Sequence, residues 1–246
     1  MKEYSALAIV YDMLRAHEDI NQWASYVYQI MMDHGIKPPH KVADVACGTG
    51  DMTLYLYDKG YQVVGVDRSQ EMLEEAYQKS MGKGIHWINQ DMLDMRFHEP
   101  VDCITCVNDG VNYLLTDDAL QKGLQQFHDN LKSGGLLLFD ISSRAKLMGM
   151  ADDFYAEEDD DVAYIWQNHF DEDKQTLTMD ISFYIREEDG RFRREEEQHV
   201  QRIHDVEHVM DLLNAVGFHR IVAYSAFTKE KPTAKDQRIQ FVAIRN

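Results

Sequence analysis

The stretch Val42-Ala43-Asp44-Val45-Ala46-Cys47-Gly48-Thr49-Gly50-Asp51 constrains the fold more strongly than any other part of this sequence. Its first half is an apolar run typical of a buried β-strand, and the apolar positions Leu54, Leu56 and Tyr57 predict a helix that begins at Asp51. Glycine tolerates positive φ and allows close approach to the backbone, and a helix N-terminus presents N–H groups without partners in the helix. The sequence therefore predicts a strand, turn and helix that bind a nucleotide-like cofactor.

The spacing of the glycines separates two classes of cofactor. A dinucleotide-binding turn has the pattern G-x-G-x-x-G, whose third glycine allows close helix packing beside a pyrophosphate. Thr53 occupies that third position here. S-adenosylmethionine has no phosphate and carries a sulfonium cation and a free amine, so a turn flanked by Asp44 and Asp51 suits it better. On these residues alone, an ordinary βα turn is the alternative.

The letters DVACGTGD, residues 44–51, resemble the first motif of the class I S-adenosylmethionine-dependent methyltransferases, an acidic residue followed by G-x-G. The resemblance covers nearly the whole chain apart from residues 142–204; it is nearest to bacterial methyltransferases of the YqeM type. The chain is more distantly similar to sugar N,N-dimethyltransferases, from which it departs over residues 142–204, and to glycine N-methyltransferase. The resemblance implies an α/β fold with a Rossmann-like, mostly parallel seven-stranded sheet, and S-adenosylmethionine as the cofactor. It also implies these cofactor-binding residues: Tyr11, Asp44, Ala46, Gly48, Gly50, Asp67, Arg68, Met72, Gln90, Asp91, Met92 and Asn108.

The N-terminal segment carries Tyr4 and Tyr11 ahead of a periodic apolar stretch over residues 20–31. The period predicts an amphipathic helix, which Gly35 and Pro38 close. In the family that the chain resembles, such a segment folds over the cofactor, which would bring Tyr11 to its methionine end and Tyr4 over the site. The alternative is a helix on the edge of the sheet with packed tyrosines.

Strands and helices alternate after the glycine turn, as they do in a doubly wound sheet. Apolar runs predict strands over residues 62–66, 85–89 and 101–107. Asp67 follows the first of these runs, and its carboxylate can accept two hydrogen bonds from a ribose diol. Asp67 could instead cap the next helix, although Ser69 is the better cap.

Polar residues also follow the next strand. The Asp91 carboxylate can accept a hydrogen bond from the exocyclic amine of adenine, and the Met92 backbone N–H can serve a ring nitrogen. The resemblance agrees with these two contacts and extends them to Gln90. A polar loop is the alternative reading of residues 90–92.

The strand over residues 101–107 ends beside the first strand, where ligands bind in open α/β sheets. Asn108 is expected to hold the methionine portion of the cofactor, because this position faces the transferring methyl group in the family. Asn112 and Tyr113 are expected to face the acceptor. The alternative is a polar connection to the helix predicted over residues 117–131.

The C-terminal part is expected to complete the core. Residues 131–140, LKSGGLLLFD, resemble the later family motif in which a glycine turn leads into a fifth buried strand. A helix capped by Asp205 is predicted to end at Gly217, and two further strands are predicted over residues 220–227 and 238–244.

Between residues 142 and 204 the pattern changes to strand-like alternation. Turns over residues 171–173 and 187–190 bound a segment with apolar residues at every second position: Leu177, Met179, Ile181, Phe183 and Ile185. We therefore predict a small antiparallel sheet inserted into a cofactor-binding core made of residues 1–141 and 205–246.

The inserted sheet should rise over the carboxyl edge of the core and cover the acceptor pocket, because it follows the fifth strand. A solvent-facing elaboration or a homodimer surface is the alternative. The acidic run over residues 157–161 predicts a solvated loop. His169, Tyr184, Arg144 and His204 are candidate acceptor-side residues with structural alternatives. No catalytic base is assigned, because alignment of the activated methyl group is the main requirement.

Composition narrows the class of acceptor. The formal net charge is −18 and the pI is about 4.9, which disfavours nucleic acid as the substrate because the negative field of the protein repels phosphates.

No apolar run has the length of a membrane span, and the first residues lack a secretory cleavage pattern, so a cytoplasmic protein without a membrane segment is expected.

Neither candidate metal motif predicts a metal site. Cys103 and Cys106 form C-x-x-C, but residues three apart on a strand point to opposite faces. His204 to His208 matches H-x-x-E-H, but a cap at Asp205 would leave His204 outside the helix. The leading hypothesis is a small-molecule N- or O-methyltransferase. Methylation of RNA or protein and a non-catalytic cofactor-binding module are the alternatives.

Overall fold

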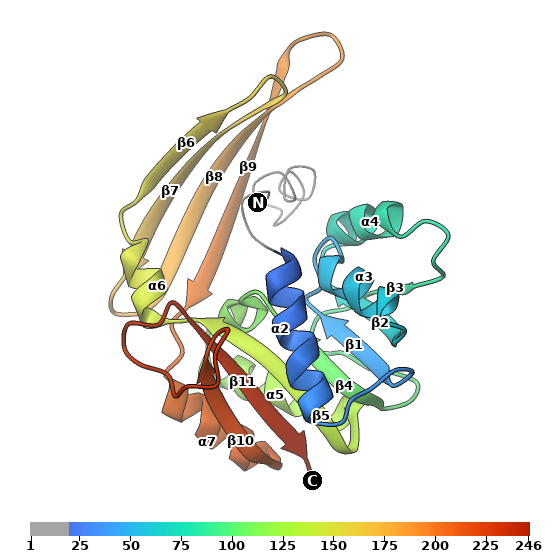
Figure 1. Cartoon of the computed structure of the whole chain (residues 1–246). Coiled ribbons are helices and arrows are strands. Elements are labelled where there is room, and N and C mark those ends of the chain that lie inside the picture. Colours follow the sequence, from blue (N-terminus) through green and yellow to red (C-terminus); the bar gives the residue numbers. More distant parts are fainter. Residues whose placement is uncertain (1–19) are drawn as a thin grey trace.

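The glycine turn lies at the centre of a seven-stranded sheet in the computed structural model, which describes residues 20–246 (Figure 1). The strand order is β10-β11-β5-β4-β1-β2-β3. Strand β11 runs opposite to the other six strands of this sheet, so the predicted mostly parallel, doubly wound sheet is confirmed. The strands are β1 (Lys41–Val45), β2 (Gln62–Asp67), β3 (His86–Asn89), β4 (Val101–Cys106), β5 (Leu131–Ser142), β10 (Phe218–Ser225) and β11 (Arg238–Arg245).

Helices pack on both faces of this sheet. Helices α2 (Ile20–Asp33) and α3 (Asp51–Asp58) share one apolar core with alternate residues of the strands, and α5 (Asp117–Asn130) and α7 (Val206–Val216) share the core on the other face. Helix α4 (Gln70–Lys79) contacts β2 and β3. Cys103 and Cys106 belong to different cores, which confirms that they point to opposite faces of β4.

The predicted helix boundaries depend on local capping and are confirmed. The Ser69 hydroxyl accepts a hydrogen bond from the Met72 N–H at 3.1 Å. The Asp205 carboxylate accepts two backbone N–H groups at the start of α7, which leaves His204 outside the helix. Gly217 follows α7 with φ 108°, a conformation that glycine adopts without strain. None of the helices within residues 20–246 is long and apolar enough to cross a membrane.

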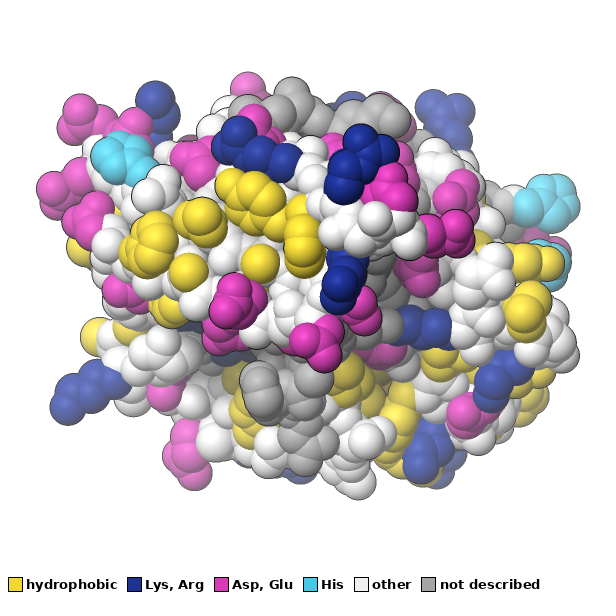
Figure 2. Space-filling model, turned by 90° about the horizontal axis from the view of Figure 1, so that it is seen from above, with side chains coloured by type: hydrophobic (Ala, Val, Ile, Leu, Met, Phe, Trp, Pro, Cys, Tyr) yellow, Lys and Arg dark blue, Asp and Glu magenta, His cyan; other side chains and the backbone are white. Residues whose placement is uncertain are grey.

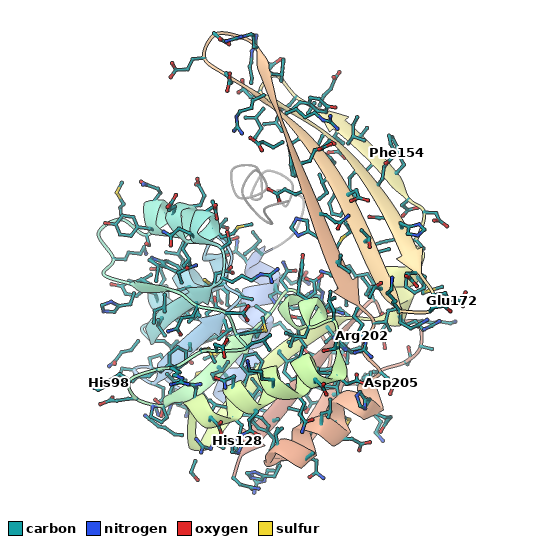
Figure 3. All side chains as sticks on the ribbon, turned by 180° about the vertical axis from the view of Figure 1, so that it is seen from behind. His98, His128, Phe154, Glu172, Arg202 and Asp205 are labelled. Atoms are coloured by element: carbon teal, nitrogen blue, oxygen red, sulfur yellow. The ribbon has the colours of Figure 1, made fainter. Side chains whose placement is uncertain are left out.

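A second, antiparallel sheet leaves the core after β5 and returns to it before α7 (Figures 1 and 3). Its strands pair in chain order as β6 (Phe154–Glu158), β7 (Val162–Asp171), β8 (Thr176–Arg186) and β9 (Phe192–Arg202). Arg202 and Asp205 lie where β9 passes back into the core (Figure 3). Leu177, Met179, Ile181 and Phe183 are buried along one face of β8, as their spacing predicts.

Two elements after β5 differ from the prediction. Glu157 and Glu158, expected in a solvated loop, belong to the exposed edge strand β6, because they pair in register with β7. The short helix α6 (Arg144–Gly149) was not predicted; the Ser143 hydroxyl caps it by accepting the Lys146 N–H at 3.2 Å. A short 3₁₀ helix, η1 (Gly110–Tyr113), follows β4.

Candidate functional site

A cavity of about 390 Å³ lies between the carboxyl ends of β1, β2 and β4 and the buried face of the antiparallel sheet. Most of the residues singled out in the sequence line it: Asp44, Ala46, Gly48, Asp67, Arg68, Met72, Gln90, Asp91, Met92, Asn108 and Tyr113. Most of these residues lie at or just after the ends of different strands, and Met72 and Tyr113 lie on the helices α4 and η1 that follow two of them, so the doubly wound topology brings them together.

The glycine turn forms one wall of the cavity. Ala46 and Gly48 both have φ 54°, and Gly50 has φ 87°. The Gly48 N–H donates to the Asp67 carboxylate at 2.8 Å, and the Cys47 N–H donates to the Val66 carbonyl at 3.1 Å. The turn is therefore tied to the end of β2, and its backbone faces the cavity.

Asp44 lies beneath the turn with only 1% of its surface exposed. Its carboxylate accepts hydrogen bonds from the hydroxyls of Thr53, at 2.6 Å, and Thr105, at 2.8 Å. Burial raises the pKa of Asp44 to about 6. Thr53, which replaces the third glycine of a dinucleotide turn, therefore supports a buried carboxylate, and a pyrophosphate beside that carboxylate would be repelled.

Asp67 is the second carboxylate in the cavity wall and is 9% exposed. Besides Gly48, it accepts the backbone N–H of Ser69 at 2.9 Å. Burial raises the pKa of Asp67, although these backbone donors oppose the shift. A carboxylate oxygen can accept more than one hydrogen bond, so Asp67 can also accept a ligand hydroxyl.

The wall continues through the loop after β3. Asp91 accepts the Leu93 N–H at 2.8 Å, and Gln90 accepts the Arg96 N–H at 3.2 Å, which holds both side chains in place.

On the adjacent wall the Arg68 guanidinium lies 5.8 Å from the centre of the Tyr113 ring. Met72 lies in one apolar cluster with residues of β8, so α4 and the antiparallel sheet meet at the cavity.

Three predicted site residues differ from the expectation or cannot be compared with it. Gly50 does not line the cavity; a Cβ there would lie 2.5 Å from the Trp87 ring, so this glycine allows packing on Trp87. Asn112 does not line it either, and the expectation that it faces the acceptor is corrected below. Tyr11 lies outside the described residues, as does Tyr4.

Asn112 is completely buried and holds the two sheets together. Its amide group donates to the carbonyls of Ser142, at 3.1 Å, and Arg202, at 2.9 Å. Its carbonyl accepts the Ser142 N–H at 2.9 Å. These partners satisfy the side chain, so its role is to fix the junction of η1, β5 and β9.

A charged network at the end of β4 was missed in the sequence. The Arg238 guanidinium donates to Asp109 at 3.3 Å, to Asn108 at 3.2 Å, and to the fully buried Asp140. Burial alone would raise the pKa of Asp109, but the positive charges of Lys146 and Arg238 hold it well below its ordinary value. No local signal links Arg238 to β4, because 129 residues separate it from Asp109.

A second missed cluster lies on the antiparallel sheet. The Tyr113 hydroxyl lies 3.3 Å from His199 Nδ1, and His199 Nε2 lies 3.2 Å from Glu197 Oε2. His199 and Glu197 are 2% and 1% exposed. The period of two over Glu197, His199 and Gln201 could have identified the buried face of β9.

The four acceptor-side candidates from the sequence do not line the cavity. His169 and Tyr184 lie on the face of the antiparallel sheet opposite the buried residues, and Arg144 donates to Gln175. His204 Nε2 lies 3.3 Å from the Val111 carbonyl, and burial lowers the pKa of His204 to about 4.

Within residues 20–246, no cluster of three His, Cys, Asp or Glu side chains has an arrangement that could hold a metal ion.

The cavity is apolar where it meets β7 and β8. Trp166, Met179 and Ile181 line it there, with Met150 from the segment after α6. His199 and Gln201 of β9 and Lys146 of α6 add polar groups. One end of the cavity can therefore hold a polar nucleotide-like molecule, and the other end can hold a second, partly apolar one.

Comparisons with known proteins agree with this arrangement. A family model described as a methyltransferase domain matches residues 42–135. YqeM of Bacillus subtilis, named as a methyltransferase, is 34% identical over 98% of this chain and 96% of its own length. The crystal structure of an S-adenosylmethionine-dependent methyltransferase from Clostridium acetobutylicum is 29% identical, covers 99% of both chains and has a TM-score of 0.85. The glycine/sarcosine N-methyltransferase of Aphanothece halophytica is 26% identical over 52% of this chain and 49% of its own.

Proposed function

Because the chain belongs to the S-adenosylmethionine-dependent methyltransferases, we propose that it methylates a nitrogen or oxygen atom of a small-molecule acceptor. The observation that carries this proposal is the continuous cavity that runs from the glycine turn to the buried face of the antiparallel sheet. Its two ends differ in polarity, which suits a polar cofactor beside a smaller, partly apolar acceptor.

The residues around the glycine turn fit S-adenosylmethionine. Asp67 would accept the ribose hydroxyls, and Asp91 with the Met92 N–H would bind the adenine. Asp44 and Asn108 would lie at the methionine end, where a carboxylate complements the ammonium group. When bound, the cofactor would supply a methyl group activated by its sulfonium sulfur, and these residues would bind the cofactor and orient that methyl group toward the acceptor.

The antiparallel sheet would cover the acceptor. We propose that residues 1–141 and 205–246 form the cofactor-binding core and that residues 142–204 form the acceptor cover. Trp166, Met179 and Ile181 would exclude water from the reacting atoms, which favours methyl transfer over hydrolysis.

The charge distribution supports a small acceptor rather than RNA. On the face seen in Figure 2, lysine and arginine side chains are scattered among acidic ones and do not form a continuous basic surface. The net charge of −18 disfavours a polyanion further. An N-methyltransferase for glycine and sarcosine among the similar proteins is consistent with an amine acceptor.

Calorimetric titration with S-adenosylmethionine and with NAD, on the wild type and on Asp67→Ala, tests the cofactor site. We expect S-adenosylmethionine alone to bind, and Asp67→Ala to weaken it about 10- to 100-fold, because hydrogen bonds to a charged group contribute about 1.5–3 kcal/mol. Asp94→Ala is the control, since Asp94 is an exposed carboxylate paired with Lys122. Unchanged affinity in Asp67→Ala would exclude the ribose assignment.

A methyl-release screen across amines, amino sugars, phenols and bulk RNA then tests the acceptor class. We expect turnover with at least one small amine or hydroxyl compound and none with RNA. Turnover of RNA alone would replace this proposal with the RNA alternative, and cofactor binding without any turnover would favour a non-catalytic module.

A further inference from the structure

We propose that Tyr113, His199 and Glu197 form a proton relay in which the Tyr113 hydroxyl takes a proton from the acceptor. The inference rests on the proposed function and deepens it, because a relay of this kind is needed only when the methylated atom carries a proton. The acceptor class that follows is a protonated nucleophile, such as a primary or secondary amine or a hydroxyl compound.

The geometry orders the three groups from the cavity inward. Tyr113 is half-buried on η1 and lines the cavity immediately after the end of β4. Its hydroxyl lies 3.3 Å from His199 Nδ1, and the other ring nitrogen, Nε2, lies 3.2 Å from the Glu197 carboxylate. A nucleophile, a base and a group that orients the base follow one another in the same way in hydrolase triads.

The carboxylate determines which nitrogen of the imidazole carries the proton. Glu197 accepts hydrogen bonds when ionised, so a neutral His199 is expected to carry its proton on Nε2 and to donate it to Glu197. Nδ1 is then an acceptor, and the Tyr113 hydroxyl donates to it. This tautomer prepares Nδ1 to receive the phenol proton.

Groups of this chain take up the proton that the acceptor loses. The acceptor N–H or O–H proton moves to the Tyr113 oxygen as the new bond to carbon forms, and the phenol proton moves to His199 Nδ1. His199 becomes an imidazolium ion, which the Glu197 carboxylate stabilises. The positive charge lost from the methyl donor is thus retained on the imidazole, and release of that proton to water resets the relay.

Neighbouring charges from other elements are compatible with this transfer. The Arg68 guanidinium, 5.8 Å from the centre of the Tyr113 ring, favours negative charge on the phenol oxygen during the transfer. Asp109 and Lys146 line the same cavity and pair with each other at 3.5 Å. Gln201, which follows on the same face of β9, is neutral and donates to Asp109 at 3.3 Å.

The tautomer of His199 can be measured without an acceptor. Long-range ¹H–¹⁵N correlation of the full chain labelled at histidine, with His199 assigned through His199→Gln and recorded at a pH at which the ring carries one proton, should show that proton on Nε2. Tyr113→Phe removes only the hydroxyl and should shift the Nδ1 resonance. A ring protonated on Nδ1, or an Nδ1 resonance that does not move in Tyr113→Phe, would overturn the relay whether or not the enzyme turns over.

Kinetics test the relay with the first small acceptor that the wild type methylates in the screen. Tyr113→Phe should lower kcat/KM about 100-fold or more, as expected for a lost general base, with S-adenosylmethionine affinity within about twofold. Its activity should recover about tenfold per pH unit as the acceptor loses its proton to solvent. His199→Gln should behave similarly.

Tyr184→Phe and His169→Gln are matched controls on the opposite face of the same sheet and should leave kcat/KM unchanged. Wild-type activity retained in Tyr113→Phe, or a loss that rising pH does not restore, would overturn the relay while leaving methyl transfer intact. Absence of cofactor binding in the wild type would instead count against the proposed function.

Discussion

Replacing Asp44 with asparagine should stabilise the fold at neutral pH and weaken the cofactor site at the same time. Asp44 is 1% exposed, and burial raises its pKa from 3.8 to about 6. Its two hydrogen-bond donors, Thr53 and Thr105, are neutral hydroxyls, so no cation among its hydrogen-bond partners compensates the charge of the ionised carboxylate. Asparagine has nearly the same shape and carries no charge.

The magnitude follows from the pKa. A shift of about two units corresponds to about 3 kcal/mol, since each unit is about 1.4 kcal/mol. A raised pKa means that the folded state binds the proton more tightly than the unfolded state does. The stability that Asp44 contributes is therefore fully present below about pH 4 and is lost as the pH rises through about 6.

Urea unfolding of the wild type and of Asp44→Asn, followed by tryptophan fluorescence between about pH 4 and pH 7, measures this difference. The variant's advantage in free energy of unfolding should be near zero at the acidic end and approach about 3 kcal/mol at neutral pH. Its affinity for S-adenosylmethionine should fall about tenfold or more, because Asp44 would no longer complement the ammonium group.

Asp102→Asn is a control for which we expect the opposite change in the free energy of unfolding at neutral pH. Burial alone would raise the pKa of Asp102, but the Lys132 ammonium and the Lys41 backbone N–H lower it. Its contribution to stability is present at neutral pH and lost on acidification, so Asp102→Asn should destabilise the protein at neutral pH. An Asp44→Asn variant that is less stable at neutral pH, by an amount independent of pH, would refute the reasoning.

Two further predictions concern stability, and a denaturant titration at neutral pH checks each through the midpoint at constant m-value. Asn112→Ala should cost about 2–4 kcal/mol, because it removes three hydrogen bonds at the junction of the two sheets; a cost below about 0.5 kcal/mol would contradict this role. Gly65→Ala should cost about 1–3 kcal/mol, since the added Cβ would lie 2.3 Å from the Trp87 ring, and an unchanged midpoint would show that the ring moves freely.

Local signals in the sequence were sufficient to predict the core and many of the residues that line the cavity beside the glycine turn. The period of two over Leu177 to Phe183 predicted the buried face of β8, and Ser69 and Asp205 predicted the starts of two helices. Carboxylates at the ends of successive parallel strands were expected at one edge, and Asp44, Asp67 and Asp91 line one cavity. Each of these signals depends on residues within one helical turn, one pleat or one strand end.

Tertiary structure decided which residues lie at the other end of the cavity, beside the antiparallel sheet. Tyr113 meets His199 across 86 residues of chain, and Arg238 meets Asp109 across 129. Asn112, expected to face the acceptor, is instead held between the two sheets. Spacing along the chain carries no information about such contacts, because they depend on the register of β9 on β8 and of β11 on β5, and a shift of one residue would turn each side chain to the other face. The sequence alone thus predicted the class of fold through local periodicity and strand ends, and the cofactor through the glycine turn and its family resemblance. The pairing of distant strands decided which side chains line the rest of the cavity, because it fixes which residues far apart in the chain lie side by side.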